Sequence, residues 1–367
     1  MSNKIKIVYT ISGLLSGGAE ISLYDICRYI NKDLFEITLI SILKGDDLEN
    51  VFNKLPNVKI IKLGFYNRRN PLILFKLRKY IKASKPDIIH TNLPVANIYT
   101  RLASLFLKKI LITTFHSPVF KDNIFYSIEK LTSKMNDYII ANSSWSKNKL
   151  IEHNYIQKEK IEIIQLGIDF SKFKSNLNDE FIKKYNLPDK TKVITYVASF
   201  KEQKGHIYLL DIIKTLCNNH KNLFFFLVGK GILLDEIKAK AIEFGIENNI
   251  IFTGNLSNVG DILINSDLFV STSLAESFGV ALVEAMYFKV PIIAYDCDAV
   301  PEIIIHEKTG YLIDLYDNES FCKTILKCLE NKNIELIDNG YNMAIEKFSI
   351  ENTVKNLENF YLQIMNK

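Results

Sequence analysis

Two glutamates stand eight positions apart in the segment Ser271–Met286, which follows a predicted strand and opens a predicted helix. Glu276 lies in the loop before that helix and Glu284 about two turns into it, so both carboxylates can face one cavity. Gly279, between them, lets a ligand approach the backbone, and the free N–H groups there favour an anion. Carboxylates so placed are good acceptors for sugar and ribose hydroxyls. The alternative is an amphipathic helix with two surface glutamates.

Further candidate side chains stand where predicted strands end. His116 follows one strand, and His90 and Asn92 end another, at the edge where parallel sheets bind ligands. An isolated histidine is more often structural, but its place after a strand favours a functional role for His116. The turn Gly229–Gly231 also follows a strand, although many turns between a strand and a helix contain glycines.

The elements that must position these residues alternate between short apolar runs and amphipathic stretches, which is typical of βαβ units and parallel sheets. The pattern runs through the first half and restarts after a polar link over residues 169–192. Strands are predicted at residues 5–9, 35–41, 58–63, 88–91, 110–114, 138–141 and 161–164, then 193–198, 223–228, 250–253, 268–271, 291–294 and 311–313. Helices are predicted at residues 19–30 and 72–84, with a last one over about 350–365.

This alternation predicts an α/β protein of two Rossmann-like domains with parallel sheets facing a central cleft. Residues 1–170 form the N-terminal domain and residues 171–348 the C-terminal domain. The last helix, in residues 349–367, is expected to cross back to the N-terminal domain. With 367 residues the chain is long enough for two cores.

The composition indicates a globular protein of a reducing compartment. The five cysteines are an odd number and none stands in a C-x-x-C pair, which favours free thiols. The apolar run Ile5–Leu15 is interrupted by polar residues, so a buried strand fits it better than a signal peptide. No apolar stretch approaches the roughly 20 residues that span a bilayer. We therefore expect a cytoplasmic protein.

The net charge of +5 is unevenly spread along the chain. Residues 1–178 hold 27 Lys and Arg against 15 Asp and Glu, a net +12, and the remainder carries −7. A half this basic suggests an anionic partner, such as acidic lipid at the inner face of a membrane or a phosphorylated acceptor. A solvated lysine-rich face is an equal alternative. Nucleic acid is not expected, because the basic stretch lacks interleaved aromatic residues.

The segment Glu276–Glu284 resembles the E-x7-E element of retaining GT-B glycosyltransferases of family 4, and the resemblance runs over nearly the whole chain. That family holds its nucleotide-sugar mainly in the C-terminal domain. The resemblance implies that Glu276 contacts hydroxyls of the donor sugar and that Glu284 contacts the ribose. It places the amides of Phe278, Gly279 and Val280 near the sugar and the diphosphate.

The segment Thr195–Gly205 resembles the family's strand and loop that supply a basic pair to the donor diphosphate. Lys204 matches the lysine of that pair, but Ser199 stands where the family has arginine. Lys201, two residues on, could supply the missing charge. A diphosphate leaving group needs cationic stabilisation as the glycosidic bond breaks, so the resemblance implies a catalytic role for Lys204.

Three more segments fit the family pattern. Gly17 and Gly18 match its first loop, where glycines let the N-terminal domain approach donor and acceptor. His116 matches a histidine close to the reacting sugar, and Gly229 matches a glycine-rich turn near the nucleotide. The pair Asp296 and Asp298 has the D-x-D form that holds Mg²⁺ or Mn²⁺ in single-domain glycosyltransferases. At this place the family carries a turn without metal, so no metal or other cofactor is expected.

Taken together, these residues predict retaining transfer of a hexose from an NDP-sugar, such as a UDP-sugar, to a hydroxyl of a glycan or lipid-linked acceptor. Surface polysaccharide or glycoconjugate synthesis is the expected setting. His116, Lys204 and Glu276 are the predicted catalytic residues, and His90 and Asn92 are candidates for the acceptor side. The leaving phosphate is expected to accept the proton of the acceptor, so no dedicated base is predicted.

Two other functions stay open. A GT-B sugar-nucleotide epimerase or a phosphorylase has the same architecture and differs in its products. A degenerate sugar-nucleotide-binding subunit is favoured only by Ser199 and by Leu166, which replaces an asparagine in the segment resembling the family's N-G-[IV]-[DE] element. The sequence does not reveal the donor sugar, its base or the acceptor.

Overall fold

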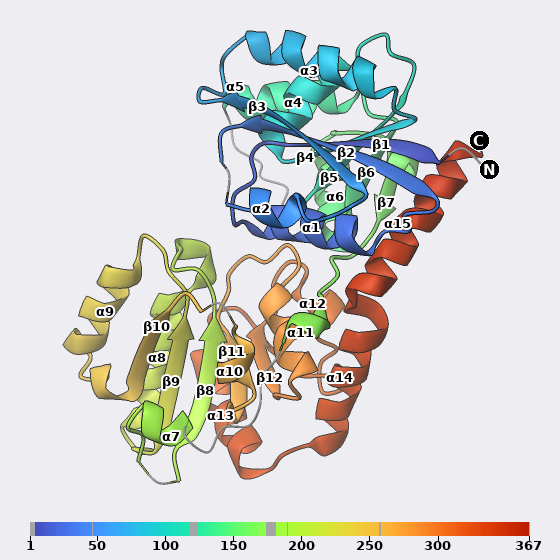
Figure 1. Ribbon diagram of the computed structural model, residues 1–367. Helices are drawn as coiled ribbons and strands as arrows, with labels where there is room; N and C mark the ends of the chain where they lie inside the picture. Colours follow the sequence, from blue (N-terminus) through green and yellow to red (C-terminus); the bar gives the residue numbers. More distant parts are fainter. Residues whose placement is uncertain are drawn as a thin grey trace. The chain divides into compact units, whose positions relative to one another are not determined.

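The computed structural model describes residues 4–45, 47–116, 123–173, 181–188, 190–256 and 258–366. It divides the chain into two compact units (Figure 1): unit 1 combines Met1–Gly167 with Ile350–Lys367, and unit 2 is Ile168–Ser349. The sequence puts these boundaries at 170 and 348. The predicted link over 169–192 includes residues 174–180 and 189, which lie outside the described residues.

Unit 1 is a seven-stranded parallel sheet in the order β3-β2-β1-β4-β5-β6-β7. Its strands are β1 (Ile5–Ile11), β2 (Phe35–Leu43), β3 (Val58–Phe65), β4 (Ile88–Asn92), β5 (Ile110–Phe115), β6 (Tyr138–Ala141) and β7 (Ile161–Ile163). Its helices are α1 (Gly18–Tyr29), α2 (Glu49–Phe52), α3 (Leu72–Ser84), α4 (Pro94–Ala103), α5 (Ile124–Ser133), α6 (Ser144–Glu152) and α15 (Ile350–Met365), with a 3-10 turn η1 (Lys158–Lys160). All seven strands predicted for the first half are present.

Alternate residues of β1 pack against different helices, as the two-residue period of a strand requires. Ile7, Tyr9 and Ile11 join the core cluster that contains α1 and α15, whereas Val8 joins the cluster that contains α3 and α4. Helices therefore cover both faces of the sheet, which explains why its strands read as nearly continuous apolar runs.

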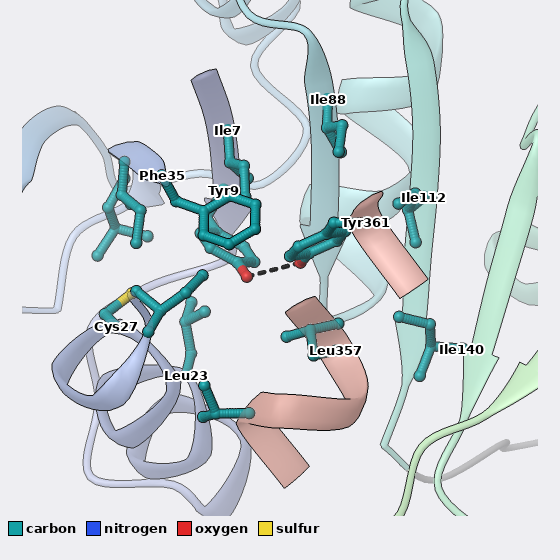
Figure 2. Packing of buried hydrophobic residues seen from close by; sticks show 14 of the residues in the cluster. Ile7, Tyr9, Leu23, Cys27, Phe35, Ile88, Ile112, Ile140, Leu357 and Tyr361 are labelled. Carbon is teal, nitrogen blue, oxygen red and sulfur yellow. Dashed lines mark hydrogen bonds between the residues drawn. The ribbon is translucent and has the colours of Figure 1, made fainter. Parts of the chain in front are cut away.

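The last helix, α15, buries an apolar face against unit 1. Leu357 and Tyr361 of α15 lie in the same core cluster as Leu23 and Cys27 of α1. Figure 2 shows Tyr361 next to Tyr9, with a hydrogen bond of 2.6 Å between the two hydroxyl oxygens. The C-terminal segment thus completes the core of the unit that contains the N-terminus.

Unit 2 is a six-stranded parallel sheet in the order β10-β9-β8-β11-β12-β13. Its strands are β8 (Lys192–Val197), β9 (Leu223–Val228), β10 (Ile250–Gly254), β11 (Leu268–Ser271), β12 (Ile292–Tyr295) and β13 (Tyr311–Ile313). Its helices are α7 (Phe181–Lys184), α8 (His206–Cys217), α9 (Leu234–Glu243), α10 (Gly260–Leu263), α11 (Val280–Tyr287), α12 (Val300–Ile303), α13 (Asn318–Glu330) and α14 (Ile334–Phe348), with 3-10 turns η2 (Phe170–Lys172), η3 (Glu202–Lys204) and η4 (Glu247–Asn249). The predicted α/β class with two parallel sheets is confirmed.

Each sheet has one point where the strand order reverses, between β1 and β4 in unit 1 and between β8 and β11 in unit 2. Ligands of open parallel sheets bind outside the carboxyl ends of the strands at such a point. The loops that follow these four strands are therefore where functional residues are expected. Among the described helices, none combines the length and apolar character needed to cross a membrane.

Candidate functional site

Lys204 and Glu276 meet at the switch point of unit 2. Lys204 follows β8 and Glu276 follows β11, and the Lys204 ammonium forms a salt bridge with a carboxylate oxygen of Glu276. Both side chains are largely buried, with 15% and 18% of their surfaces exposed. An ammonium has three N–H donors, so the pair leaves donors of Lys204 for a second anion. The structure thus brings together two residues that the sequence names as catalytic.

Buried contacts hold the loop that carries Lys204. The Tyr196 hydroxyl donates to the Lys204 carbonyl at 2.7 Å and lies 2.9 Å from the Ser273 hydroxyl. Gly205 adopts a left-handed φ of +59°, and a β-carbon there would lie 2.0 Å from the Thr272 carbonyl oxygen. Only glycine fits this close approach, so the residue after Lys204 ties the β8 loop against the end of β11.

The backbone of Glu276 is fixed by the segment after β12. Its N–H donates to a carboxylate oxygen of Asp298 at 3.1 Å, and its carbonyl accepts from the Ala299 N–H at 3.1 Å. Asp298 itself has a left-handed φ of +46°, a conformation that aspartate tolerates better than most residues. Part of the D-x-D pattern therefore positions Glu276.

The start of α11 has the form expected from the sequence. Gly279 precedes the helix with φ +101°, and Phe278 before it is buried. The N–H group of Val280 lies in the first turn, where no helix carbonyl can accept from it. Glu284 is half-buried within the helix, and burial raises the pKa of its carboxyl to about 7. Glu284 thus carries a partial proton at neutral pH.

Ser199, Lys201 and Gly229 lie in the loops after β8 and β9. Ser199 is half-buried and its carbonyl accepts from the Lys201 N–H at 2.8 Å, whereas the Lys201 side chain is exposed. Gly229 has φ +143°, and a β-carbon there would lie 2.1 Å from the Ala198 carbonyl oxygen. Gly229 therefore lets the β8 and β9 loops touch. Within the described part of the chain, no hydrogen bond or ion pair of the Lys201 side chain bears on its predicted role, which stays a prediction.

His90, Asn92 and His116 gather at the carboxyl ends of β4 and β5 in unit 1. His116 Nε2 donates to Asn92 Oδ1 at 3.0 Å, and the His116 carbonyl accepts from Asn142 Nδ2 at 2.8 Å. Burial lowers the pKa of His116 to about 4 and that of His90 to about 3. Both rings are therefore neutral at pH 7.

Gly17 and Gly18 begin α1 beside the carboxyl end of β1. Gly17 is the N-terminal cap residue, and a β-carbon there would lie 2.4 Å from a Glu20 carboxylate oxygen. Glu20 is buried, and burial raises the pKa of its carboxyl. Among the described residues, Gly18 has no neighbour within 4 Å of a β-carbon position. The glycines thus make room for one carboxyl group and leave the start of the helix open.

For several residues that shape these sites, the sequence does not indicate the role that they have in the structure. Asp298 reads as half of a metal motif, and Tyr196 as an ordinary core residue. Tyr361 lies 271 positions after His90, yet its hydroxyl is 2.6 Å from His90 Nδ1. Contacts between such distant positions depend on the tertiary structure, so sequence pattern alone does not reveal them.

Two family models match consecutive parts of this chain. Residues 16–172 match the model described as Glycosyltransferase Family 4, and residues 178–343 match Glycosyl transferases group 1. A UDP-Gal:alpha-D-GlcNAc-diphosphoundecaprenol alpha-1,3-galactosyltransferase of Escherichia coli is 25% identical, over 99% of this chain and 98% of that protein. The capsular polysaccharide biosynthesis glycosyltransferase CapM of Staphylococcus aureus is 23% identical over 91% of each chain.

Several solved structures have the same fold as this chain. HepE of Anabaena, crystallised with UDP and glucose, superposes with a TM-score of 0.84 at 20% identity, over 97% of this chain and 99% of that one. A glycosyltransferase from Rickettsia africae gives a TM-score of 0.83 at 23% identity over 99% of each chain. With the family models covering most of its length, the chain belongs to the group 1 glycosyltransferases, which have the GT-B fold.

Proposed function

We propose that this protein transfers a hexose from an NDP-sugar to a hydroxyl of a glycan or lipid-linked acceptor with retention of anomeric configuration. The observation that carries the proposal is the salt bridge between Lys204 and Glu276 at the switch point of unit 2. It places a cation suited to a diphosphate beside a carboxylate suited to sugar hydroxyls.

The named relatives suggest which substrates to try first. The Escherichia coli relative is a galactosyltransferase that uses UDP-Gal and a diphosphoundecaprenol-linked acceptor, and CapM acts in capsular polysaccharide biosynthesis. HepE was crystallised with UDP-glucose as well as with UDP and glucose. We propose a UDP-hexose donor, a lipid-linked or growing polysaccharide acceptor and a cytoplasmic reaction in surface polysaccharide or glycoconjugate synthesis.

In the proposed reaction Lys204, assisted by Lys201, stabilises the departing diphosphate. Glu276 accepts hydrogen bonds from hydroxyls of the donor sugar, and Glu284 accepts from the ribose. The first-turn N–H groups of α11 favour the diphosphate as a helix N-terminus favours anions. His116 contacts the reacting sugar, and the leaving phosphate takes the acceptor's proton. No metal ion takes part.

A panel of NDP-sugars and NDPs screened by thermal shift tests donor binding. We expect UDP and a UDP-hexose to raise the melting temperature of unit 2, because a ligand at 100 times its Kd stabilises by about 2.7 kcal/mol. The panel needs GDP- and ADP-sugars as competitors. The active donor should then be incubated with a lipid-linked acceptor. We expect NMR of the product to show the same anomeric configuration as in the donor.

The Glu284→Gln variant makes this screen specific. Because burial raises the folded-state pKa of Glu284 to about 7, above its ordinary value of 4.5, the folded protein loses stability as pH rises through 7. At pH 8 the unliganded variant should therefore be more stable than the parent, by about 1 to 3 kcal/mol, and the gain should vanish near pH 4.5. UDP should stabilise the variant less than the parent. Equal stabilisation of both proteins by UDP would contradict the ribose contact.

Product analysis separates the alternative functions. Release of a free modified sugar or a changed NDP-sugar in acceptor-free buffer would indicate an epimerase. No stabilisation by any NDP or NDP-sugar would indicate a chain without donor binding. Inversion of the anomeric configuration would refute retention while leaving transfer intact.

We also propose that unit 1 associates with anionic lipid through one face, here called the α3 face. Leu72, Phe75, Lys76 and Lys79 occupy the outer side of α3 and are exposed, opposite three buried residues of the same helix. Apolar side chains ringed by cations are typical of helices that lie in a membrane interface.

Neighbouring segments extend the α3 face. Arg78 donates to the carbonyls of Ala103 and Leu105 at 2.6 and 2.8 Å, which holds the loop with Phe106 beside α3. Phe106 is 90% exposed. Between Glu49 and Asp122 the sequence has 14 Lys and Arg but one acidic residue, Asp87. Each cation near an acidic leaflet contributes about 1 kcal/mol to the free energy of membrane binding. This charge balance therefore favours binding to anionic lipid.

Liposome sedimentation tests the α3 face. At low salt we expect the protein to pellet with anionic vesicles and to stay in solution with neutral ones. The double variant Lys76→Glu/Lys79→Glu should lose most of this binding, whereas Lys214→Glu/Lys238→Glu in unit 2, with the same change of charge, should retain it. Equal recovery with neutral and anionic vesicles would remove the proposal.

A further inference from the structure

A chain of four polar groups, three buried and the last, Thr114, half-buried, runs through unit 1. The Tyr9 hydroxyl lies 2.6 Å from the Tyr361 hydroxyl, which lies 2.6 Å from His90 Nδ1. His90 Nε2 lies 2.7 Å from the Thr114 hydroxyl. Tyr9 and His90 are direct partners across β1 and β4, so the strands bring these groups together, and α15 supplies Tyr361 (Figure 2).

The direction of these hydrogen bonds follows from counting protons. Each hydroxyl has one hydrogen, and a neutral imidazole has one ring N–H. Tyr9 is fully buried, and among the described residues the Tyr361 hydroxyl is the one hydrogen-bond partner of its oxygen. If Tyr361 donated to Tyr9, the Tyr9 hydrogen would be buried without an acceptor, which proteins avoid. Tyr9 therefore donates to Tyr361, and Tyr361 donates to His90 Nδ1.

This direction fixes the tautomer of His90. Because Nδ1 accepts from Tyr361, the ring proton of the neutral imidazole lies on Nε2 and is donated to Thr114 Oγ1. The burial that lowers the pKa of His90 to about 3 keeps the ring neutral at pH 7. Thr114 Oγ1 then has a hydrogen left to donate, and no other partner of this oxygen occurs among the residues that the structure describes.

A second unused donor lies beside Thr114. Asn92 pairs with Thr114 across β4 and β5, and its Oδ1 accepts from His116. Its Nδ2 is buried, and no described residue accepts a hydrogen bond from it. Asn92, Thr114, His90 and His116 all line one cavity of about 30 Å³. That volume has room for one water molecule, and a water needs polar partners of this kind.

We propose that Tyr361 is a positioning residue that holds His90 as the Nε2–H tautomer, so that Thr114 and Asn92 direct their free donors at one water oxygen in this cavity. The water connects the chain of hydroxyls to Asn92, and Asn92 holds His116. Through this chain of hydrogen bonds, the last helix orients His116 at the edge of the unit 1 sheet.

The tautomer of His90 is the direct test, and it does not depend on enzymatic activity. Long-range ¹H–¹⁵N correlation spectra of ¹⁵N-histidine-labelled protein distinguish Nδ1–H from Nε2–H rings, and a His90→Asn variant assigns the signal. We expect Nε2–H in the parent protein and in Tyr9→Phe, because Tyr361 still donates there. In Tyr361→Phe we expect a mixture of tautomers. An Nδ1–H ring in the parent, or an unchanged spectrum in Tyr361→Phe, overturns the proposal.

Two further measurements complete the test. A crystal structure should show a water oxygen within hydrogen-bond distance of Thr114 Oγ1 and Asn92 Nδ2, and an empty cavity refutes the water site. The catalytic consequence rests on the proposed function. Tyr361→Phe should lower kcat about threefold to tenfold, the size of one lost hydrogen bond, with KM unchanged, and Tyr9→Phe should stay within about twofold. An unchanged kcat with altered tautomer overturns the positioning role, whereas absence of transfer in the parent refutes only the proposed function.

Discussion

Replacing Lys204 by alanine is expected to lower kcat for sugar transfer by about 10²- to 10³-fold, the cost of removing one preorganised group that stabilises a developing charge. The ammonium lies against Glu276 in a largely buried site, where its field is weakly screened by water. The measurement is release of NDP from the active donor with saturating acceptor. KM for the donor should change less than kcat, because the leaving-group charge develops as the bond breaks.

Matched variants make this result specific to the site. Lys214→Ala removes an exposed lysine of α8 in the same unit, and it should leave kcat unchanged. Glu276→Ala should also lose transfer, and the double variant Lys204→Ala/Glu276→Ala should be no worse than the poorer single variant, because paired residues act as a unit. Lys201→Ala tests whether Lys201 assists Lys204 in stabilising the diphosphate. If it does, we expect kcat to fall about tenfold. Retention of full transfer by Lys204→Ala would refute the proposed leaving-group role.

Arg101→Met is expected to destabilise unit 1 by about 3 to 5 kcal/mol, the range for breaking a buried charge network by removing one partner. Arg101 is fully buried in α4 and donates to the Thr113 and Thr132 hydroxyls and to the Glu129 carbonyl. Burial lowers its pKa to about 10, opposed by the nearby Glu129 carboxylate. Methionine fills much of the space but removes these donors, and it takes the nearby positive charge away from the Glu129 carboxylate.

The single tryptophan makes the loss measurable in one unit. Trp145 lies in α6 of unit 1, so urea unfolding followed by its fluorescence reports that unit. The double variant Arg101→Met/Glu129→Gln should recover part of the free energy of unfolding, because the introduced amide carries no charge and its oxygen can still accept from Asn97. A loss below about 1 kcal/mol in Arg101→Met would show that the buried guanidinium is dispensable.

Local pattern was enough to locate the strands, because both faces of each sheet are covered and each strand is an apolar run. Where the predicted ends of strands differ from the structure, the causes are local. The sequence ends the first strand at Tyr9, but β1 continues to Ile11, since Thr10 is buried and shares a hydrogen bond with the Thr100 hydroxyl at 2.8 Å. The strand predicted from Pro291 begins at Ile292, because proline has no N–H for the ladder.

The sequence by itself determined the two-unit α/β architecture and the identity of Lys204, Glu276, Glu284 and His116 as residues after strands or in the helix start. The architecture depends on short-range periodicity. The four site residues were identified from short segments of about ten positions that resemble the family's motifs. The pairing of Lys204 with Glu276 across 72 positions is visible only in the fold.

Tertiary structure alone decided which buried groups orient the candidate residues. Asp298 fixes the Glu276 backbone, and Tyr361 of the last helix reaches His90. A polar side chain buried by folding must find a partner wherever the topology provides one, and sequence separation carries no information about that choice. The types of the candidate residues can therefore be read from the sequence. Their orientation is set by strand order in each unit and, in unit 1, by the packing of α15.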